Sequence, residues 1–429
     1  MNSKSIATSA QPKSSYILSM VILGALYFVL GFVTWVNGTL IPYFKIACEL
    51  KTDLQSFLVA TSFFIAYAAM AIPSSFVLKA TGYKKGMAAG LVVMAIGAIL
   101  FVPAAQGRNF NLFLTALFIL GTGSALLQTA QNPYVSIIGP IDSAGSRISM
   151  MGICNKVAGI LAGLIFGAIA LKNTDTLVES LKTMDAVAKD GTLNELASRV
   201  IGPYTIIAVV LVALAIAIMF SNLPDIEDDG GEASPETKLA STKTSVFQFP
   251  HVLLGMLAIF LYVGVEVMAG DTIISYGISL GISIADARFF TQYTLGFMLV
   301  GYLVGIFAIP KYISQSAALK WCAILGVIFT VLAVSTNGYV SVFFIATLGL
   351  ANSLMWPAIF PLGIDGLGRF TKIGAALLVM GIAGGAILPL IYGWLALKTS
   401  SQMAYVMMIP CYLYILYFAV KGYRAGKSA

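Results

Sequence analysis

The sequence has little charge, and this scarcity excludes an ordinary soluble fold. Only 10% of its 429 residues are charged, whereas soluble domains carry about 25%. Hydrophobic residues make up 59% of the chain, which is the composition of an integral membrane protein. The net charge of +7 is therefore interpreted through membrane topology and not as a nucleic-acid-binding surface. We expect a lipid bilayer around the chain and no nucleic-acid partner.

Residues that bind metals or form disulfides are also few. The four cysteines, at positions 48, 154, 322 and 411, form no C-x-x-C pair, and His251 is the single histidine. This scatter argues against a disulfide framework or a cysteine-based metal site. The polar N-terminus, MNSKSIATSAQPKSS, has no cleavage site before a long apolar span, and it is typical of a cytoplasmic tail. We therefore predict no cofactor, and a protein that is not an enzyme.

Long apolar runs dominate the rest of the chain. Each run is close to the ~20 residues that cross a bilayer. Twelve are found, at 16–43, 55–79, 84–104, 111–138, 146–171, 200–222, 250–279, 286–309, 318–336, 340–364, 370–396 and 403–420. Lysines and arginines concentrate in the loops on one side, which the positive-inside rule assigns to the cytoplasm. The sequence thus predicts an all-α protein of twelve transmembrane helices, in the cell inner membrane with both termini cytoplasmic.

A polar stretch divides the chain into two halves. Residues 224–245 are acidic and rich in glycine, serine and proline, as in a flexible linker. The predicted organisation is a tail at 1–15, a six-helix half at 16–222, a linker at 223–249, a second half at 250–420 and a tail at 421–429. In the outer loop, 172–199, the apolar spacing predicts a short amphipathic helix.

The two halves repeat one another. Gln128 precedes Pro133 by five residues, and Asn352 precedes Pro357 by the same interval. A loop with an aspartate and an arginine follows in both cases, and then a glycine-rich helix. Small residues at four-residue spacing let helices approach closely. We expect this packing within one chain, hence a monomer. Two such halves are typical of a secondary transporter of the major facilitator type.

Two carboxylates remain once the loops are accounted for. Of the 18 acidic residues, only Glu266 and Asp271 fall deep inside a predicted helix. Their spacing turns them about 140° apart on a straight helix, and a break at Gly270 would bring them together. Burying a carboxylate in a membrane is costly, which indicates a function. The alternative is structural pairing with a cation.

Lys156 is the one cation predicted inside the membrane. It either extends its ammonium toward the cytoplasm or pairs with one of the two carboxylates across the halves. An anionic substrate would need several intramembrane cations, so a single lysine favours a neutral substrate.

Amides and aromatic residues complete the intramembrane polar set. Amides offer both donors and acceptors, and aromatic faces pack against C–H surfaces. Together they favour a neutral polyol such as a sugar, although any single amide can instead join two helices by a hydrogen bond. The candidates for sugar binding are Trp35, Asn37, Gln128, Asn132, Asn155, Tyr276, Gln292, Asn352 and Trp356.

Several longer stretches carry a resemblance to a known family. The segments GFVTWVNGTLIPYFK (31–45), GYKKG (82–86), FVPAA (101–105), LLQTAQNPYVSIIGP (126–140) and DGLGRFTKIGAALLVMGIAGGAILP (365–389) resemble the fucose–galactose–glucose symporter family of the major facilitator superfamily. The likeness covers nearly the whole chain. TWVNG, LLQTA, GICNK and YVGVEVMAGDT look most like the branch for N-acetylglucosamine uptake, near the glucose/galactose members.

The resemblance implies sugar import by alternating access with a coupling cation, and the sequence departs from it at the acids. The fucose-type members carry an aspartate where this chain has Gly38 and a glutamate where it has Gln128. Coupling would then fall to Glu266 and Asp271. Aligning VNGTLI (36–41) with AGDTII (269–274) places Asp271 opposite Gly38 in the repeat.

Two questions stay open at this point. A proton is the ion that the resemblance implies, and sodium is its rival, in which case Glu266 and Asp271 would be metal ligands. An uncoupled sugar facilitator and a sugar sensor that does not transport are the alternative functions. A drug–proton antiporter fits the amide-rich centre less well.

Overall fold

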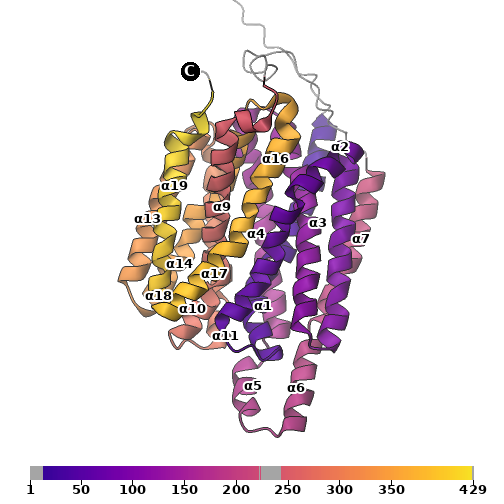
Figure 1. The fold of residues 1–429 in the computed structure, drawn as a ribbon, viewed down its shortest axis with the longest axis vertical. Helices are drawn as coiled ribbons and strands as arrows, with labels where there is room; N and C mark the ends of the chain where they lie inside the picture. Colours follow the sequence, from indigo (N-terminus) through magenta and orange to yellow (C-terminus); the bar gives the residue numbers. More distant parts are fainter. Residues whose placement is uncertain (1–12, 222, 224–242, 428–429) are drawn as a thin grey trace, which may run out of the picture.

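The structure is a computed structural model that describes residues 13–221, 223 and 243–427. Its helices run side by side in one bundle, and the described residues form no strand. In Figure 1 the C-terminal end lies at the top, and α5 and α6 project beyond the bundle at the bottom. Most of the predicted N-terminal tail and of the predicted linker lies outside the described residues.

The first half is built from five long helices and two short ones. They are α1 (Lys13–Ala47), α2 (Asp53–Gln106), α3 (Phe110–Ile137), α4 (Ala144–Ala170), α5 (Thr174–Leu181), α6 (Ala186–Ser198) and α7 (Ile201–Phe220). Side-chain caps fix several helix starts, because the first N–H groups of a helix have no partner within it. Thr52 accepts from the N–H of Gln55 ahead of α2, and Asn109 accepts from that of Leu112 ahead of α3.

The second half contains more interruptions. Its helices are α9 (Pro250–Asp271), α10 (Ile273–Ser279), α11 (Ile284–Ala287), α12 (Phe290–Ala308), α13 (Gln315–Ser335), α14 (Gly338–Ser353), α15 (Met355–Ile364), α16 (Thr371–Met380), α17 (Gly384–Lys398), α18 (Ser401–Ala404) and α19 (Met408–Val420). Four apolar spans are divided into two α-helical pieces each: α11 with α12, α14 with α15, α16 with α17, and α18 with α19, while the short helix α10 follows α9 after Thr272.

The described residues contain eleven helical stretches that are long and apolar enough to cross a membrane. The stretch α2 has 54 residues and would be roughly 80 Å long at 1.5 Å per residue, whereas a bilayer core is about 30 Å thick. At Gly82 the backbone leaves the helical region, with φ 76° and ψ 173°, a conformation open to glycine. Counting α2 as two crossings gives twelve, and the predicted all-α fold is confirmed.

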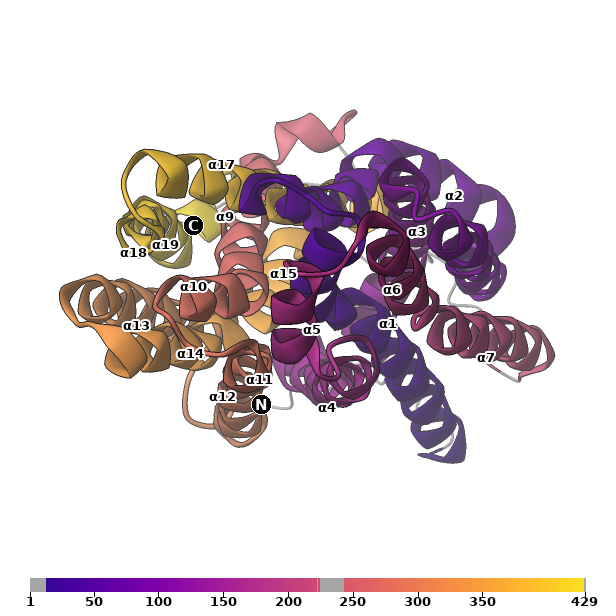
Figure 2. The same ribbon diagram turned by 90° about the horizontal axis from the view of Figure 1, so that it is seen from below.

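The two halves stand next to each other across a long interface. Figure 2 shows α2, α3 and α7 on one side of the molecule and α13, α14 and α18 on the other. The halves meet where α4 packs against α12 and where α2 packs against α16 and α17. Glycines of α4 permit close approach on two sides: a Cβ atom on Gly159 would lie 2.8 Å from Cδ1 of Trp35 on α1, within the first half, and one on Gly163 would lie 1.8 Å from Nε2 of Gln292 on α12, across the halves. The small residues thus permit close contact within the chain, as expected.

The long loop at 172–199 contains a hairpin of two helices, α5 and α6, where the sequence predicted a single short one. The apolar spacing was interrupted because Asp185 starts a new helix by accepting a hydrogen bond from the N–H of Ala188. The hairpin is tied to the first half: Lys189 pairs with Glu49 at 2.6 Å, and Asp190 pairs with Arg108 at 2.9 Å. From below, α5 lies over the middle of the molecule, between the halves (Figure 2).

The repeated arginines play different parts in the two halves. Arg147 is buried and donates to the carbonyls of Val135 and Ser136, at 2.9 and 2.7 Å. It thereby satisfies carbonyl groups at the C-terminal end of α3, which have no partner within that helix. Arg369, its counterpart, is exposed and donates to the carbonyl of Lys243 at 2.7 Å.

Candidate substrate and ion site

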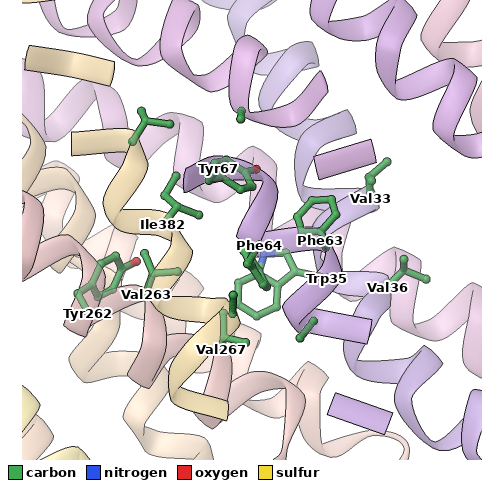
Figure 3. Packing of buried hydrophobic residues seen from close by; sticks show 14 of the residues in the cluster. Val33, Trp35, Val36, Phe63, Phe64, Tyr67, Tyr262, Val263, Val267 and Ile382 are labelled. Carbon is green, nitrogen blue, oxygen red and sulfur yellow. The ribbon is translucent and has the colours of Figure 1, made fainter. Parts of the chain in front are cut away.

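A cavity lies between the two halves, and both contribute to it. It has an empty volume of about 740 Å³, including its mouth. The first half contributes Tyr27, Leu30, Thr34, Trp35, Phe64, Gln128, Ile148, Gly152, Asn155 and Lys156, and the second contributes Tyr262, Val263, Glu266, Val267, Asp271, Tyr302, Trp356 and Ile382. Figure 3 shows part of this meeting, with Trp35 and Phe64 next to Val267.

The halves touch each other on both sides of this cavity. Toward the end that carries the hairpin, the hydroxyl of Thr61 donates to the carbonyl of Ala386 at 2.9 Å. Toward the opposite end, the amide of Gln315 donates to the carbonyl of Asp142 at 3.1 Å. Each of these contacts joins one half to the other, one on either side of the cavity.

Of the two alternatives predicted for Lys156, the structure shows the ion pair across the halves. Its Nζ lies 3.0 Å from Oε1 of Glu266, and both side chains are at most 10% exposed. The same Nζ lies 4.0 Å from the centroid of the Trp35 ring, in the geometry of a cation–π contact. The indole N–H of Trp35 donates to Oδ1 of Asn155 at 2.9 Å. Four of the predicted site residues therefore form one connected group on α1, α4 and α9.

Asp271 faces the cavity without such a partner. Its side chain belongs to a residue that is 2% exposed, and its Oδ1 atom accepts no hydrogen bond from the described residues. A Cβ atom on Gly38 of α1 would lie 2.9 Å from that oxygen. The sequence repeat had placed Asp271 opposite Gly38, and the structure brings the two residues into contact.

Helix α9 does not break at Gly270, where a break could have brought Glu266 and Asp271 together. Helix α9 continues to Asp271, and the interruption falls at Thr272, whose N–H still donates to the carbonyl of Met268 at 3.2 Å. Gly270 has a different role: a Cβ atom there would lie 2.6 Å from Cζ3 of Trp35. The missing side chain makes room for the indole, and Glu266 and Asp271 reach the cavity from an intact helix.

Two further predicted residues line the cavity. Gln128 donates from Nε2 to the hydroxyl of Tyr67 at 2.7 Å, so this amide is oriented from within the first half. Trp356 stacks on Phe360, with ring centroids 5.4 Å apart. Both present polar or aromatic surface to the space between the halves.

Five predicted sugar-binding residues do not line the cavity. Asn37 follows Trp35 by two residues and so turns to the opposite face of α1. Asn132 accepts from the hydroxyl of Tyr27, and Asn352 accepts from that of Tyr412 at 2.9 Å. The remaining two are Tyr276, whose hydroxyl bonds that of Ser341 at 2.6 Å, and Gln292, which lies against Gly163. Contacts between helices thus account for four of these residues, whereas the amide of Asn37 is buried with no hydrogen-bond partner among the described residues.

The sequence argument missed several aromatic residues of the cavity. They are Tyr27, Phe64, Tyr262 and Tyr302. One signal was available, because Tyr262 precedes Glu266 by four residues and so shares its helix face. Tyr302 had none, since it enters the cavity through the close approach of α12 to Gly152 of α4, where a Cβ atom would lie 2.6 Å from its ring.

Known proteins resemble this chain over most of its length. The family model of the Major Facilitator Superfamily matches residues 23–377. A glucose/galactose transporter of Brucella abortus is 35% identical over 422 residues, which is 97% of each chain. The L-fucose–proton symporter of Escherichia coli is 28% identical, over 99% of this chain and 97% of its own. Among solved structures, FucP in the outward conformation superposes with a TM-score of 0.77 at 26% identity, over 97% of this chain and 100% of its own.

These matches and the fold define a membrane transporter, not an enzyme, and the chain belongs to the major facilitator superfamily. Within it, its relatives are the fucose–galactose–glucose symporters, the family that the sequence motifs indicated.

Proposed function

We propose that this protein imports a neutral sugar, a hexose or an N-acetylhexosamine, by symport with a cation. It would work as a monomer in the cell inner membrane, with both termini in the cytoplasm, by alternating exposure of the central cavity. The observation that carries the proposal is the composition of that cavity. It lies between the halves, it is lined by aromatic rings and amides, and its one ammonium group is already paired.

The sugar would bind among Trp35, Gln128, Asn155 and Trp356. Amides can donate to and accept from hydroxyl groups, and the indole faces can cover the C–H surface of a pyranose ring. Because Glu266 neutralises Lys156 at 3.0 Å, the cavity offers no free cation to an anionic substrate. The curated relatives named as sugar transporters support this substrate class.

The coupling ion would use Glu266, Asp271 or both, since they are the carboxylates that line the cavity. A coupled carrier needs a group whose charge or ligation changes when the ion binds. A relative named as a proton symporter supports a proton, and sodium is the competing ion. An uncoupled facilitator is the second candidate, because the Lys156–Glu266 pair would also serve as a purely structural bridge between the halves.

Transport by purified protein in proteoliposomes tests the proposal. Labelled D-glucose, D-galactose and N-acetyl-D-glucosamine would each be offered with an imposed proton gradient, an imposed sodium gradient, or neither. Symport predicts accumulation above the equilibrium level with one gradient only, and counterflow with no gradient. Equilibration without accumulation under every gradient would identify a facilitator, and sugar binding without counterflow would identify a sensor.

A further inference from the structure

The two carboxylates of the cavity differ in their surroundings. Glu266 accepts from Lys156 at 3.0 Å, and the lysine is also held over Trp35, 4.0 Å from the ring centroid. A carboxylate and an ammonium at that distance, both removed from water, stabilise each other's charged forms. Removing the charge of Glu266 would leave Lys156 buried and unpaired. The pair is therefore neutral as a unit.

Asp271 has no comparable partner. It is 2% exposed, and its Oδ1 atom is buried against α1 and α12, facing Gly38 and Thr291. The hydroxyl of Thr291 donates to the carbonyl of Gly270 at 2.6 Å. The charged groups close enough to act on Asp271 are Glu266 on its own helix and Lys156 on α4, and they already neutralise each other. An ionised Asp271 would give the closed site a net negative charge, which is costly away from water.

Building on the proposed symport, we infer that Asp271 alone carries the coupling ion, that this ion is a proton, and that the Lys156–Glu266 pair keeps its charges throughout the cycle. Asp271 is protonated when the halves close around the cavity. It releases the proton when the site opens and water reaches the carboxyl group.

The backbone near Asp271 favours a proton over sodium. Sodium sites in transporters use carbonyl oxygens that an unwound helix exposes. Here α9 is helical through Asp271, and the Thr272 N–H still donates to the carbonyl of Met268. The carbonyls of Ala269 and Gly270 accept from Thr294 and Thr291, at 3.1 and 2.6 Å. A proton needs one oxygen, which Oδ1 of Asp271 supplies.

The position of the carboxyl group, rather than the helix that carries it, then determines coupling. A Cβ atom on Gly38 would lie 2.9 Å from Oδ1 of Asp271. A carboxyl group built on residue 38 would therefore occupy the space that Asp271 leaves if it is replaced by glycine. The double variant Gly38→Asp/Asp271→Gly moves the acid from the second half to the first while keeping its place in the interface.

The test uses the full chain in proteoliposomes that contain a pH-sensitive dye. D-Galactose, D-glucose and N-acetyl-D-glucosamine are added in parallel, without an imposed gradient, and lumenal acidification is recorded beside sugar counterflow. Asp271→Asn should retain counterflow and lose the acidification. Lys156→Gln/Glu266→Gln, which replaces the ion pair by two amides, should retain the acidification even where sugar affinity falls. Asp286→Asn removes an exposed carboxylate on α11 and serves as the control.

The swapped variant Gly38→Asp/Asp271→Gly decides the question of position. It should regain the acidification that Asp271→Asn lacks. A swap that performs counterflow but stays uncoupled would overturn the positional claim. Acidification that survives in Asp271→Asn, or that disappears in the double amide variant, would overturn the assignment to Asp271. Accumulation driven by sodium alone would reject the proton and leave symport standing, whereas absence of wild-type counterflow would reject the proposed function itself.

Discussion

Several glycines within each half meet the backbone of a neighbouring helix very closely, whereas glycines between the halves meet mainly side chains. A Cβ atom on Gly31 would lie 2.1 Å from the carbonyl oxygen of Asn155, within the first half, and one on Gly384 would lie 1.7 Å from that of Phe260, within the second. The same pattern recurs at Gly121 and Gly349. Across the halves, the nearest atoms belong to the side chains of Tyr302, Gln292, Phe64 and Phe57, opposite Gly152, Gly163, Gly385 and Gly393.

This difference indicates where the molecule can move. Two backbones in contact cannot separate or slide without displacing whole helices, and packed interiors transmit such strain. A ring or an amide can change its rotamer instead. Two contacts across the halves do involve backbone, but the distances are longer: a Cβ atom on Gly145 would lie 3.2 Å from the carbonyl oxygen of Pro357, and one on Gly38 would lie 3.4 Å from Cα of Asp271. We infer two rigid halves joined by an interface of adjustable side chains, which suits alternating access.

The largest effect is expected from breaking the ion pair between Lys156 and Glu266, which joins the halves. Lys156→Gln leaves Glu266 charged, buried and unpaired, which should cost about 3–5 kcal/mol of stability. Thermal unfolding in detergent would measure it as a lower melting temperature. Lys156→Gln/Glu266→Gln removes both charges and should recover most of the loss. Equal melting temperatures for the single and double variants would contradict the role of the pair.

The next effect concerns a contact within one half. Gly384→Ala places a methyl group 1.7 Å from the carbonyl oxygen of Phe260, so α17 and α9 must separate. We expect a loss of about 3 kcal/mol, at the upper end for overpacking, seen as a lower melting temperature. Gly296→Ala is the matched control, because nothing lies within 4 Å of its added Cβ atom. If the two variants unfold at the same temperature, the contact between backbones does not limit stability.

A third prediction separates the sugar site from the packing around it. Gln128→Ala removes an amide that lines the cavity and is oriented within the first half by Tyr67. Sugar binding measured by calorimetry should weaken by about 1–3 kcal/mol, since polar groups of the sugar lose a partner. Dependence of the residual transport on the ion gradient should persist. Tyr67→Phe, which removes only the orienting hydroxyl, should have a smaller effect, and unchanged affinity in Gln128→Ala would exclude a direct contact.

The smallest effect on stability is expected at Gly385, which allows contacts within a half and between the halves to be compared at adjacent residues. Gly385 follows Gly384 but faces the other half, where a Cβ atom would lie 3.0 Å from Cγ of Phe64. Gly385→Ala should cost no more than about 1 kcal/mol, because the ring can shift. It should instead slow counterflow, which requires this interface to rearrange. A melting temperature as low as that of Gly384→Ala would show that contacts within a half and contacts between the halves do not differ in this way.

The fold was predictable from the sequence because each crossing is a long apolar run. The apolar runs 55–79 and 84–104 were counted separately because a short segment that contains Gly82 lies between them. At Gly82 the backbone of α2 does leave the helical region. The repeat was readable as well, and it placed Asp271 opposite Gly38. These features follow from local composition and spacing, which a single sequence contains.

The site was predictable only in part, because a residue's type does not reveal which side of its helix faces the partner half. Trp35 and Asn37 lie two residues apart, and only the first lines the cavity. Asn132 and Asn352 are polar and intramembrane, as expected, yet the amide oxygen of each accepts a hydrogen bond from a tyrosine hydroxyl. Tyr302 reaches the cavity through tertiary contact alone. The Lys156–Glu266 pair stayed one of two alternatives, since the direction of a lysine side chain depends on what lies across the interface.

The hairpin of α5 and α6 makes its end of the molecule sensitive to ionic strength. Its link to the first half includes the pairs Lys189–Glu49 and Arg108–Asp190, in which both carboxylates are at least 46% exposed. Exposed charges are screened over about 8–10 Å at moderate salt. The central Lys156–Glu266 pair is shielded from solvent and keeps its strength. Added salt should therefore loosen the hairpin from the first half while leaving the central ion pair, and any binding in the cavity, unaltered.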